Sequence, residues 1–362
     1  MSGQTNGHEQ ESWRGPATVK DIARMSGVSV GTVDRVLHNR GRVSPATATR
    51  VWEAVEQLKY SPNLVARNLS KAQRRVFAVL MPGAEQDSGY WQITISGIEA
   101  ALSELAHHYV SVNYYHFDRT DPDSFRQTAS ALLQAEPDGV LLAPTLFEES
   151  KEFITRLGYL PCVVFDGEVP NSNVLSTINQ DSFESGLLAG KLIQLLDPTG
   201  PYVTVTIGSA DYHLRRRREG FVRFFEAVGK SNIDHFELAQ IGGEAQLRAA
   251  LKQMKQKPGS VFVTNALAHI VARELNDSAM AHTPIIGYDL IPENATCLRT
   301  GLMDFVINQE PRRQGYNSLY ALYRHVVLRE AVEPRIRMPI DIVMRENLDF
   351  HLQLGSRERV AL

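Results

Sequence analysis

From residue 76 onward, short runs of apolar residues alternate with longer stretches in which apolar positions recur at helical spacing. Strands that alternate with helices on this scale predict parallel sheets covered by helices on both faces. The units are too many for one small sheet, so we expect two α/β lobes, with the chain crossing between them near residues 165–180 and 287–310. The predicted strands are VFAVLM (76–81), YVSVNYY (109–115), GVLLA (139–143), CVVFD (162–166), YVTVTI (202–207), SVFVT (260–264), PIIGYD (284–289) and MDFVI (303–307).

The segment before these strands carries the pattern of three short helices. Thr18 and Asp21 have the spacing of a capping box at the start of the first helix, and Gly27 suits the sharp turn that follows it. Ser29 can cap the second helix, and the Ser-Pro pair at 44–45 suits the start of the third. The positions expected to face inward are Val19, Ile22, Ala23, Val33, Val36, Leu37, Val51, Trp52, Val55 and Leu58.

Two helices joined by a tight glycine turn and supported by a third form a helix-turn-helix, whose second helix enters the major groove of DNA. A small helical bundle without a partner has the same pattern, so the pattern alone leaves both interpretations open. The following segment, SPNLVARNLSKAQRR (61–75), starts like a helix but allows only about two turns, which are marginal alone in water. A frayed interdomain linker is the alternative for this segment.

The charge distribution favours a nucleic-acid partner for the amino-terminal part. Of the formal net charge of −3, residues 1–75 contribute +6, from 12 Lys and Arg against 6 Asp and Glu, and the rest contributes −9. A basic module on a larger acidic body is typical of nucleic-acid-binding proteins. Cys162 and Cys297 have no disulfide or zinc spacing, and we expect no metal site. The chain shows no apolar leader and no run of about 18 apolar residues, so we expect a cytoplasmic protein without a membrane partner.

The stretches TVKDIARMSGVSVGTVDRVL and RVSPATATRVWEAVEQLKYSPNLVARNLS, between Thr18 and Ser70, strongly resemble the lactose-repressor-like (LacI/GalR) family of bacterial transcription regulators. The resemblance implies an N-terminal all-α helix-turn-helix domain at 17–60, after a disordered tail at 1–16. It also implies that 61–75 is a hinge helix and linker. That hinge orders when two subunits place their copies in a minor groove, where Leu69 wedges between base steps.

The same resemblance places DNA contacts on the second helix. Val30, Gly31 and Arg35 stand at base-contacting positions, with Thr32 and Asp34 nearer the phosphates. Arg35 can pair with a guanine edge, and Val30 can touch a thymine methyl group. Asp34 replaces the usual serine, and its carboxylate can repel phosphates, accept from a cytosine amino group or orient Arg35. The other DNA-contact candidates are Thr18, Ser29, His38, Asn39, Arg42, Asn63, Ala66 and Arg67.

Residues 76–345 resemble the two-lobed, type I periplasmic sugar-binding fold that this family carries as its effector domain. In doubly wound sheets, ligands bind beyond the carboxyl ends of the strands. Asp166, Asn265, Asp289 and Gln309 follow predicted strands, and their carboxylate and amide groups suit sugar hydroxyls. Each alone is more typical of a turn or cap, but their recurrence at strand ends favours an effector site.

The run LRRRREGFVRFFEAV (214–228) adds an arginine to this set. On a helical wheel Arg217 is in line with Phe221, Phe224 and Val228, the expected inward stripe, and the other arginines form a solvated face. By the resemblance, Arg217 is the cleft arginine, which can pair with sugar hydroxyls or a carboxylate. A structural ion-pair partner is the alternative role.

Tyr90 and Trp91 follow the first predicted strand, where related clefts stack an aromatic ring on a sugar, and apolar packing is the alternative for both. A monosaccharide or related polyol is the first expectation for the ligand. Gly167 and Ala266 depart from the family's usual arginine and acidic residue, which leaves a sugar acid, an amino sugar or inositol open. No Gly-rich phosphate loop is present, which disfavours a phosphate.

The sequence therefore predicts a transcriptional repressor whose affinity for operator DNA is controlled by a small sugar-like effector bound between two lobes. The expected partners are double-stranded operator DNA, the effector and a second copy of the chain in a homodimer. With no phosphate loop or nucleophile visible, neither an enzyme nor a cofactor is expected. A solute-binding sugar sensor without DNA binding is the alternative function. Residues 346–362 are expected to form a C-terminal tail without the leucine heptads of a tetramer bundle.

Overall fold

The computed structural model describes residues 17–37, 41, 43–58, 60, 74–208, 211–231, 233–239, 243–253, 257–278, 280 and 282–357. The chain divides into two compact units, Met1–Ser70 and Lys71–Leu362. The predicted tail at 1–16 and almost all of the predicted hinge at 61–75 lie outside the described residues. No helix among those described is long and apolar enough to cross a membrane.

The amino-terminal unit contains the three expected helices, α1 (Val19–Ser26), α2 (Val30–Leu37) and α3 (Pro45–Gln57). The predicted capping box is confirmed, because the Thr18 side chain accepts from the Asp21 backbone N–H and Asp21 bonds back to Thr18. Gly27 has φ 66°, a left-handed conformation that ends α1 at low steric cost. The buried core of this unit comprises Ile22, Ala23, Val33, Val36, Val51 and Ala54.

One expected core position of α3 is wrong. Trp52 is 49% exposed, whereas Val51 and Ala54 are buried. Successive helical residues are about 100° apart around the axis, so the face that holds Val51 and Ala54 turns Trp52 away from α1 and α2. The apolar character of Trp52 misled the prediction, because surface positions tolerate single large apolar side chains.

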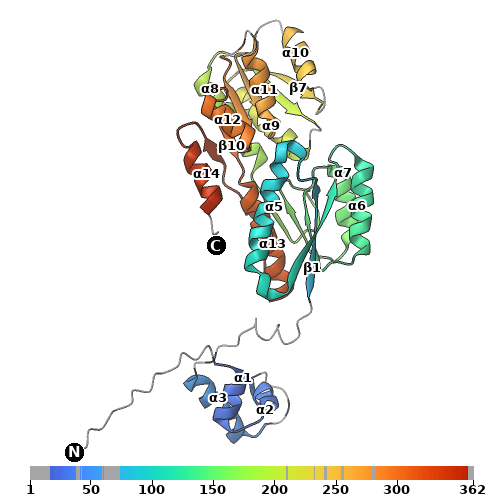
Figure 1. The fold of residues 1–362 in the computed structure, drawn as a ribbon, viewed down its shortest axis with the longest axis vertical. Helices are drawn as coiled ribbons and strands as arrows, with labels where there is room; N and C mark the ends of the chain where they lie inside the picture. The colour runs from blue at the N-terminus through green and yellow to red at the C-terminus, as the bar shows by residue number, and fades with distance from the viewer. Residues whose placement is uncertain are drawn as a thin grey trace, which may run out of the picture. The chain divides into compact units, whose positions relative to one another are not determined.

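The first lobe of the larger unit is a sheet in the order β11-β5-β4-β3-β1-β2, with every pairing parallel. Helices α5 and α13 cover one face and α6 and α7 cover the other (Figure 1). The strands are β1 (Arg75–Pro82), β2 (Val110–Phe117), β3 (Gly139–Leu142), β4 (Cys162–Phe165), β5 (Ser176–Asn179) and β11 (Arg335–Arg337). The helices are α5 (Gln86–Glu104), η1 (Ala106–His108), α6 (Pro122–Gln134), α7 (Phe147–Leu157), α13 (Pro311–Tyr323) and its π-helical continuation η2 (Arg324–Leu328).

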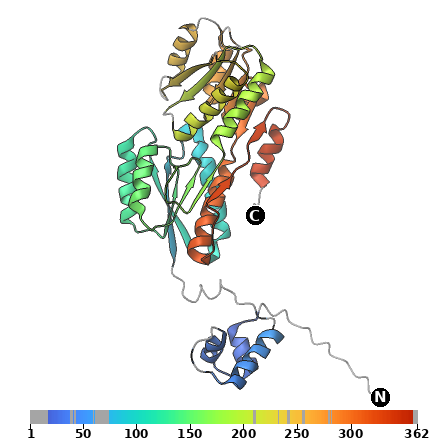
Figure 2. The ribbon, with the colours of Figure 1, turned by 180° about the vertical axis from the view of Figure 1, so that it is seen from behind.

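The second lobe repeats this design with the sheet order β12-β10-β9-β8-β6-β7, in which only the β10–β12 pairing is antiparallel among the pairings described. Helices α8 and α9 pack on one face, and α11 and α12 on the other (Figure 2). The strands are β6 (Tyr202–Ile207), β7 (Ile233–Leu238), β8 (Ser260–Val263), β9 (Ile285–Tyr288), β10 (Phe305–Asn308) and β12 (Asp341–Val343). The helices are α8 (Ser182–Leu196), α9 (Tyr212–Ala227), α10 (Gly243–Gln253), α11 (Ala268–Asn276), α12 (Pro292–Thr300) and α14 (Leu348–Arg357).

The described chain crosses between the lobes at residues 180–181, 309–310 and 338–340. The first two crossings lie at the carboxyl ends of the predicted segments, 165–180 and 287–310. The third crossing was not predicted. All of the predicted strands are present, so the expected two-lobed α/β fold is confirmed.

The carboxyl-terminal boundary differs from the expectation. Residues 346–362 were expected to form a tail, but α14 belongs to the second lobe. Leu348 is buried in the core of that lobe, and Asp349 accepts from Arg299 of α12 at 2.8 Å. The buried Leu348 and the bond from Arg299 to Asp349 fix the start of this helix against α12, which a search for heptads alone could not detect.

Candidate functional site

The candidate DNA-reading surface is the outward side of α2. Val30 is 46% exposed, and Gly31, Asp34 and Arg35 are also exposed, as a groove-entering helix requires. Ser29 caps this helix, because its Oγ accepts from the Thr32 backbone N–H at 3.2 Å. The predicted contact residues that lie outside the described residues are His38, Asn39, Arg42, Asn63, Ala66, Arg67 and Leu69.

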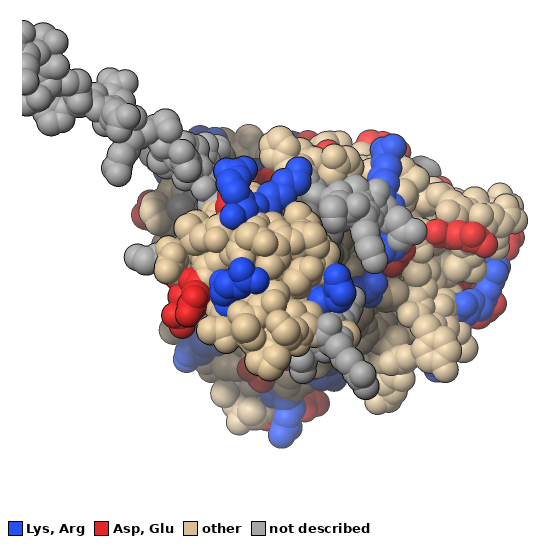
Figure 3. All heavy atoms as spheres, turned by 90° about the horizontal axis from the view of Figure 1, so that it is seen from below, with Lys and Arg blue, Asp and Glu red and all other residues tan. Residues whose placement is uncertain are grey.

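A contact with the backbone of α2 fixes the Arg35 side chain. Its Nε donates to the Gly31 carbonyl at 3.1 Å, which holds the guanidinium along the exposed side of α2. Thr18 is exposed at the start of α1. On the nearest part of the surface in Figure 3, Lys and Arg side chains are more frequent than Asp and Glu. The exposed arginines of this unit have the charge that a phosphate backbone attracts.

A narrow pocket lies at the carboxyl ends of the strands, between the two lobes. Side chains from both lobes and from the crossing at 309–310 line it. All of the residues predicted for effector binding are among them. The lining comprises Asp87, Tyr90, Trp91, Arg119, Thr145, Asp166, Asp211, His213, Leu214, Arg217, Asn265, Ala266, Asp289 and Gln309.

A hydrogen-bond network connects the predicted residues inside the pocket. Tyr90 Oη donates to Asp166 Oδ1 at 2.5 Å and accepts from Gln309 Nε2 at 3.0 Å. Gln309 Nε2 also donates to Asp289 Oδ2 at 3.3 Å. Arg217 donates to Gln309 Oε1 at 3.0 Å and has its guanidinium 3.5 Å from the centre of a tyrosine ring. Arg217 is thus held in one orientation before any ligand arrives.

The aspartates of the pocket stand on unusual backbone. Asp87, Asp166 and Asp289 have φ values of 52°, 68° and 62°, in the left-handed region that non-glycine residues rarely adopt. Such conformations cost of order 1–3 kcal/mol each and tend to occur at functional sites. Here they turn carboxylates from the strand ends and the start of α5 toward the pocket.

Several buried polar atoms of the pocket have no hydrogen-bond partner within the described chain. Burial without a partner costs about 1–3 kcal/mol for each group, so these atoms are the natural contacts for a ligand. Three of them are acceptors and one is a donor. They are Asp87 Oδ1, Asn265 Oδ1, Asp289 Oδ1 and Arg217 Nε.

Burial also governs the charge of the pocket. Desolvation raises the pKa of Asp289 to about 8, against the nearby positive charge of Arg217. Desolvation likewise raises the pKa of Asp166, opposed by the Tyr90 hydrogen bond. Burial, together with Arg217 and Arg119, holds the pKa of His213 well below its usual value, so this imidazole is neutral at pH 7. The pocket therefore offers groups that suit hydroxyls, which both donate and accept.

The sequence-based prediction missed an ion-pair bridge between the lobes. Arg119 Nη1 donates to Asp87 Oδ2 at 2.6 Å within the first lobe, and Nη2 donates to Asp211 Oδ2 of the second lobe at 2.5 Å. All three side chains are buried. His213, also missed, has Nε2 3.9 Å from Asp166 Oδ2. Arg119 follows β2 closely, so the strand-end rule could have found it.

The inward stripe of α9 differs from the helical-wheel prediction. Arg217 and Phe221 are buried as expected, but the next buried position is Phe225. Phe224 is only partly buried and Val228 is 42% exposed. Steps of four residues from 217 to 221 and 225 follow the sheet surface, whereas the step of three to 224 rotates away from it. The inward direction of Arg217 is unaffected.

A helix-turn-helix unit joined to a two-lobed α/β unit with a buried polar pocket defines a class of proteins, the ligand-responsive DNA-binding regulators. Comparison with known proteins agrees with this class. Residues 18–63 match the family described as bacterial regulatory proteins, lacI family, and residues 77–330 match the periplasmic binding protein domain. The chain belongs to the lacI family of transcriptional regulators, with a periplasmic-binding-protein-like domain.

Relatives and a solved structure extend the likeness over most of the chain. The HTH-type transcriptional repressor PurR of Mannheimia succiniciproducens is 26% identical over 349 residues, which cover 92% of this chain and 98% of that protein. The ribose operon repressor of Escherichia coli K12 is 26% identical over 285 residues, 75% of this chain and 83% of that protein. The lac repressor dimer, solved with operator and the anti-inducer ONPF, shares the fold, with a TM-score of 0.63, 20% identity and coverage of 92% of this chain and 99% of that one.

Proposed function

We propose that this regulator is a repressor controlled by an uncharged polyhydroxy effector, a monosaccharide or related polyol, bound in the pocket between the lobes. The observation that carries the proposal is the set of unpartnered buried acceptors on Asp87, Asn265 and Asp289. A ligand with several hydroxyl donors satisfies them, and the neighbouring Arg217 Nε takes a hydroxyl or ring oxygen. The name of the ribose operon repressor, a relative, is consistent with a sugar.

The charge balance of the pocket disfavours an acidic ligand. Four aspartates and two arginines line it, and Arg119 is already engaged by two of those aspartates. A ligand carboxylate or phosphate at the unpartnered Asp87 Oδ1 meets an acceptor of the same kind and places like charges close together, whereas Asp289, whose pKa is raised to about 8, is mostly uncharged at pH 7. A sugar acid, which the sequence left open, is therefore the weaker candidate.

The proposed regulation joins the two units through a homodimer. Two helix-turn-helix units of a dimer reach two half-sites of a near-palindromic operator. The effector bridges both lobes, so its binding favours the closed arrangement and shifts the dimer between states of different operator affinity. By linkage, operator binding must change effector affinity by the same factor.

Operator binding tests the regulator function. The full-length protein is expected to bind a fragment of its own promoter more tightly than unrelated DNA of equal length, by fluorescence anisotropy. Arg35→Ala is expected to weaken specific binding by about 1–3 kcal/mol, roughly 5- to 150-fold, because a bidentate guanine contact is lost. Arg50→Ala, which removes an exposed arginine of α3, is the control. Equal losses of specific and nonspecific binding in Arg35→Ala would contradict a base contact.

A ligand panel tests the effector class. Thermal unfolding is measured with neutral monosaccharides, inositol, amino sugars and the uronic acids of the same skeletons. A neutral polyol is expected to raise the Tm of the full-length protein, while the matching acid does not, and Asp289→Asn is expected to reduce the shift. A variant lacking residues 1–70, which leaves the larger unit whole, should keep the shift and lose operator binding. Stabilisation by acids alone would refute the proposed ligand chemistry.

A further inference from the structure

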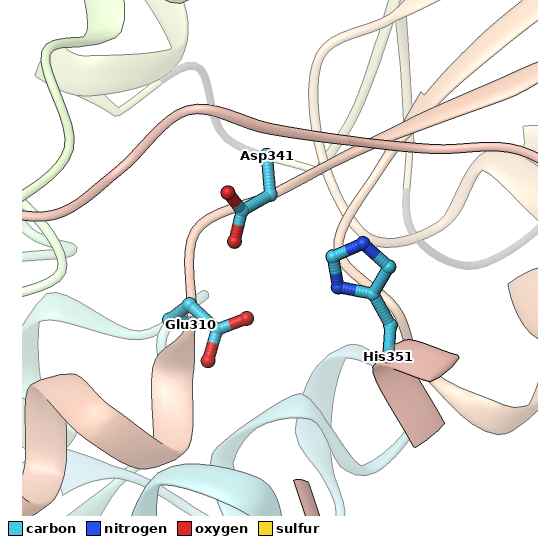
Figure 4. Close-up of side chains that lie close together, drawn as sticks. All are labelled: Glu310, Asp341 and His351. Atoms are coloured by element: carbon cyan, nitrogen blue, oxygen red, sulfur yellow. The ribbon is translucent and has the colours of Figure 1, made fainter. Parts of the chain in front are cut away.

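Glu310, Asp341 and His351 form a cluster of metal-ligating side chains away from the pocket. One ligand atom of each lies within 4.8 Å of the others, and all three residues are half-buried. Figure 4 shows the two carboxylates and the imidazole around one common space. Among the described residues, this is the cluster of His, Cys, Asp and Glu that meets the spacing of a metal site.

The three ligands come from separate segments at the hinge. Glu310 lies in the crossing that leads from β10 to α13. Asp341 is the first residue of β12, directly after the crossing at 338–340. His351 comes from α14 of the second lobe. A bound ion would therefore tie two crossing segments to the carboxyl-terminal helix.

Neighbouring side chains orient these ligands. Asn308 Nδ2 donates to Glu310 Oε1 at 2.7 Å, and Asn347 Nδ2 lies 3.5 Å from His351 Nε2. Glu310 has φ 56°, a left-handed conformation that non-glycine residues rarely adopt and that tends to occur at functional sites. Groups that hold a ligand side chain in place are a regular part of metal sites.

The cluster also has access to solvent. Glu310 and His351 line a second, open pocket between the α5–α13 side of the first lobe and α14. This pocket gives an ion a path of entry and room for a water molecule. A three-ligand set with an open position for water is a common arrangement for zinc.

We propose that Glu310, Asp341 and His351 bind a divalent transition-metal ion, with Zn²⁺ as the best match. An imidazole combined with carboxylates suits Zn²⁺ and its neighbours, whereas Mg²⁺ and Ca²⁺ prefer oxygen ligands alone. Ligand atoms about 2.1 Å from a tetrahedral ion lie roughly 3.4 Å apart, so small side-chain rotations complete the site. The ion neutralises the charge of the two carboxylates.

The position gives the ion a regulatory consequence. Glu310 follows Gln309, which lines the effector pocket and bonds to Arg217 and Tyr90. An ion that holds Glu310 in place restricts the motion of the crossing at 309–310, about which the lobes close. Metal binding is thus expected to change effector affinity, and the site stands whether or not the effector is a sugar.

Titration of the full-length, chelator-treated protein with Zn²⁺ by calorimetry tests the site. One equivalent per chain is expected, and Co²⁺ should give the visible d–d absorption of a bound ion. His351→Ala and the isosteric Asp341→Asn are each expected to weaken binding at least tenfold, with Mg²⁺ binding much weaker than Zn²⁺. His282→Ala, at an exposed position elsewhere in the second lobe, is the control and should bind like the unmodified protein.

Circular dichroism and thermal unfolding establish that each variant is folded. Unchanged Zn²⁺ affinity in both His351→Ala and Asp341→Asn would overturn the site, as would the absence of a stoichiometric binding event in the unmodified protein. A loss in His282→Ala equal to that in His351→Ala would show binding to surface imidazoles and would overturn it as well.

Discussion

Replacing Arg119 with methionine is expected to lower the free energy of unfolding of the larger unit by about 3–5 kcal/mol, because it leaves two buried carboxylates without their counter-charge. Asp87 and Asp211 both accept from Arg119, and the side chains of all three are no more than 6% exposed. Methionine keeps most of the volume of the arginine stem. The decrease in the free energy of unfolding therefore measures the loss of the charge and its hydrogen bonds. Urea denaturation followed by circular dichroism measures it.

Arg126→Met is the matched control. Arg126 also makes two ion pairs, with Asp123 at 2.6 Å and Glu149 at 2.8 Å, but its side chain is 53% exposed. Solvent screens such pairs, so Arg126→Met is expected to lose much less stability than Arg119→Met. If the two variants lose similar amounts of stability, burial is not what makes the Arg119 bridge strong, and the account of the bridge fails.

The Arg119 bridge also explains how ligand and closure are linked. The guanidinium holds Asp87 Oδ2 on one lobe and Asp211 on the other, so the bridge forms when the lobes are together. The second oxygen of Asp87 is buried and has no partner in the described chain. Closure of the lobes removes that oxygen from water and leaves it without a hydrogen bond. A ligand hydroxyl that donates to it removes this cost in the closed state, so ligand binding favours the closed state over the open one.

Local sequence signals were sufficient for the amino-terminal unit. Thr18, Gly27 and Ser29 each determine a helix end through their own backbone or side chain, and such signals act over three or four residues. Trp52 was misplaced because its burial depends on how α3 packs against the other two helices. The spacing of apolar residues along α3 locates its inward face only to within one residue.

The larger unit shows where pattern reasoning reaches its limit. The central strands were found because both of their faces are buried and they read as continuous apolar runs. β5 (STIN), β7 (IDHFEL), β11 (RIR) and β12 (DIV) were missed, since they are short, polar or at the sheet edge, where side chains face solvent. The third crossing was missed with β11 and β12, which flank it.

Arg217, Tyr90 and Trp91 were expected mainly from the family resemblance. The strand-end rule identified Asp166, Asn265, Asp289 and Gln309, because it relies on topology that the alternation of strands and helices already implies. It could not identify Asp87, Asp211 or His213. These residues stand at the beginnings of α5 and α9, and only the packing of one lobe against the other brings them to the pocket. Their roles depend on contacts between distant segments, for which a single sequence carries no signal.

Helix α9, which carries Arg217 and His213 to the pocket, is positioned by glycines at its crossing with α8. A Cβ at Gly186 would lie 2.0 Å from the Arg217 carbonyl oxygen, and one at Gly220 would lie 2.0 Å from the Phe183 carbonyl oxygen. Both obstacles are backbone atoms, which side-chain rotation cannot remove. The two helices approach this closely only because both positions lack a side chain.

Gly186→Ala is therefore expected to push α9 away from α8. It should lower the free energy of unfolding by about 3 kcal/mol, the upper end of the range for overpacking. Because Arg217 moves with α9, most of the ligand-induced Tm shift should also be lost. Gly190→Ala, one turn along α8, is the graded comparison, because its Cβ meets Phe224 side-chain atoms at 2.8 Å, whereas the Cβ at Gly186 meets a backbone oxygen at 2.0 Å. The gain of about 1 kcal/mol in helix propensity from glycine to alanine offsets part of the cost, so Gly190→Ala should lose less stability than Gly186→Ala. Urea unfolding and the thermal-shift panel measure both. A Gly186→Ala protein with normal stability and a full ligand shift would mean that the α8–α9 crossing does not position Arg217.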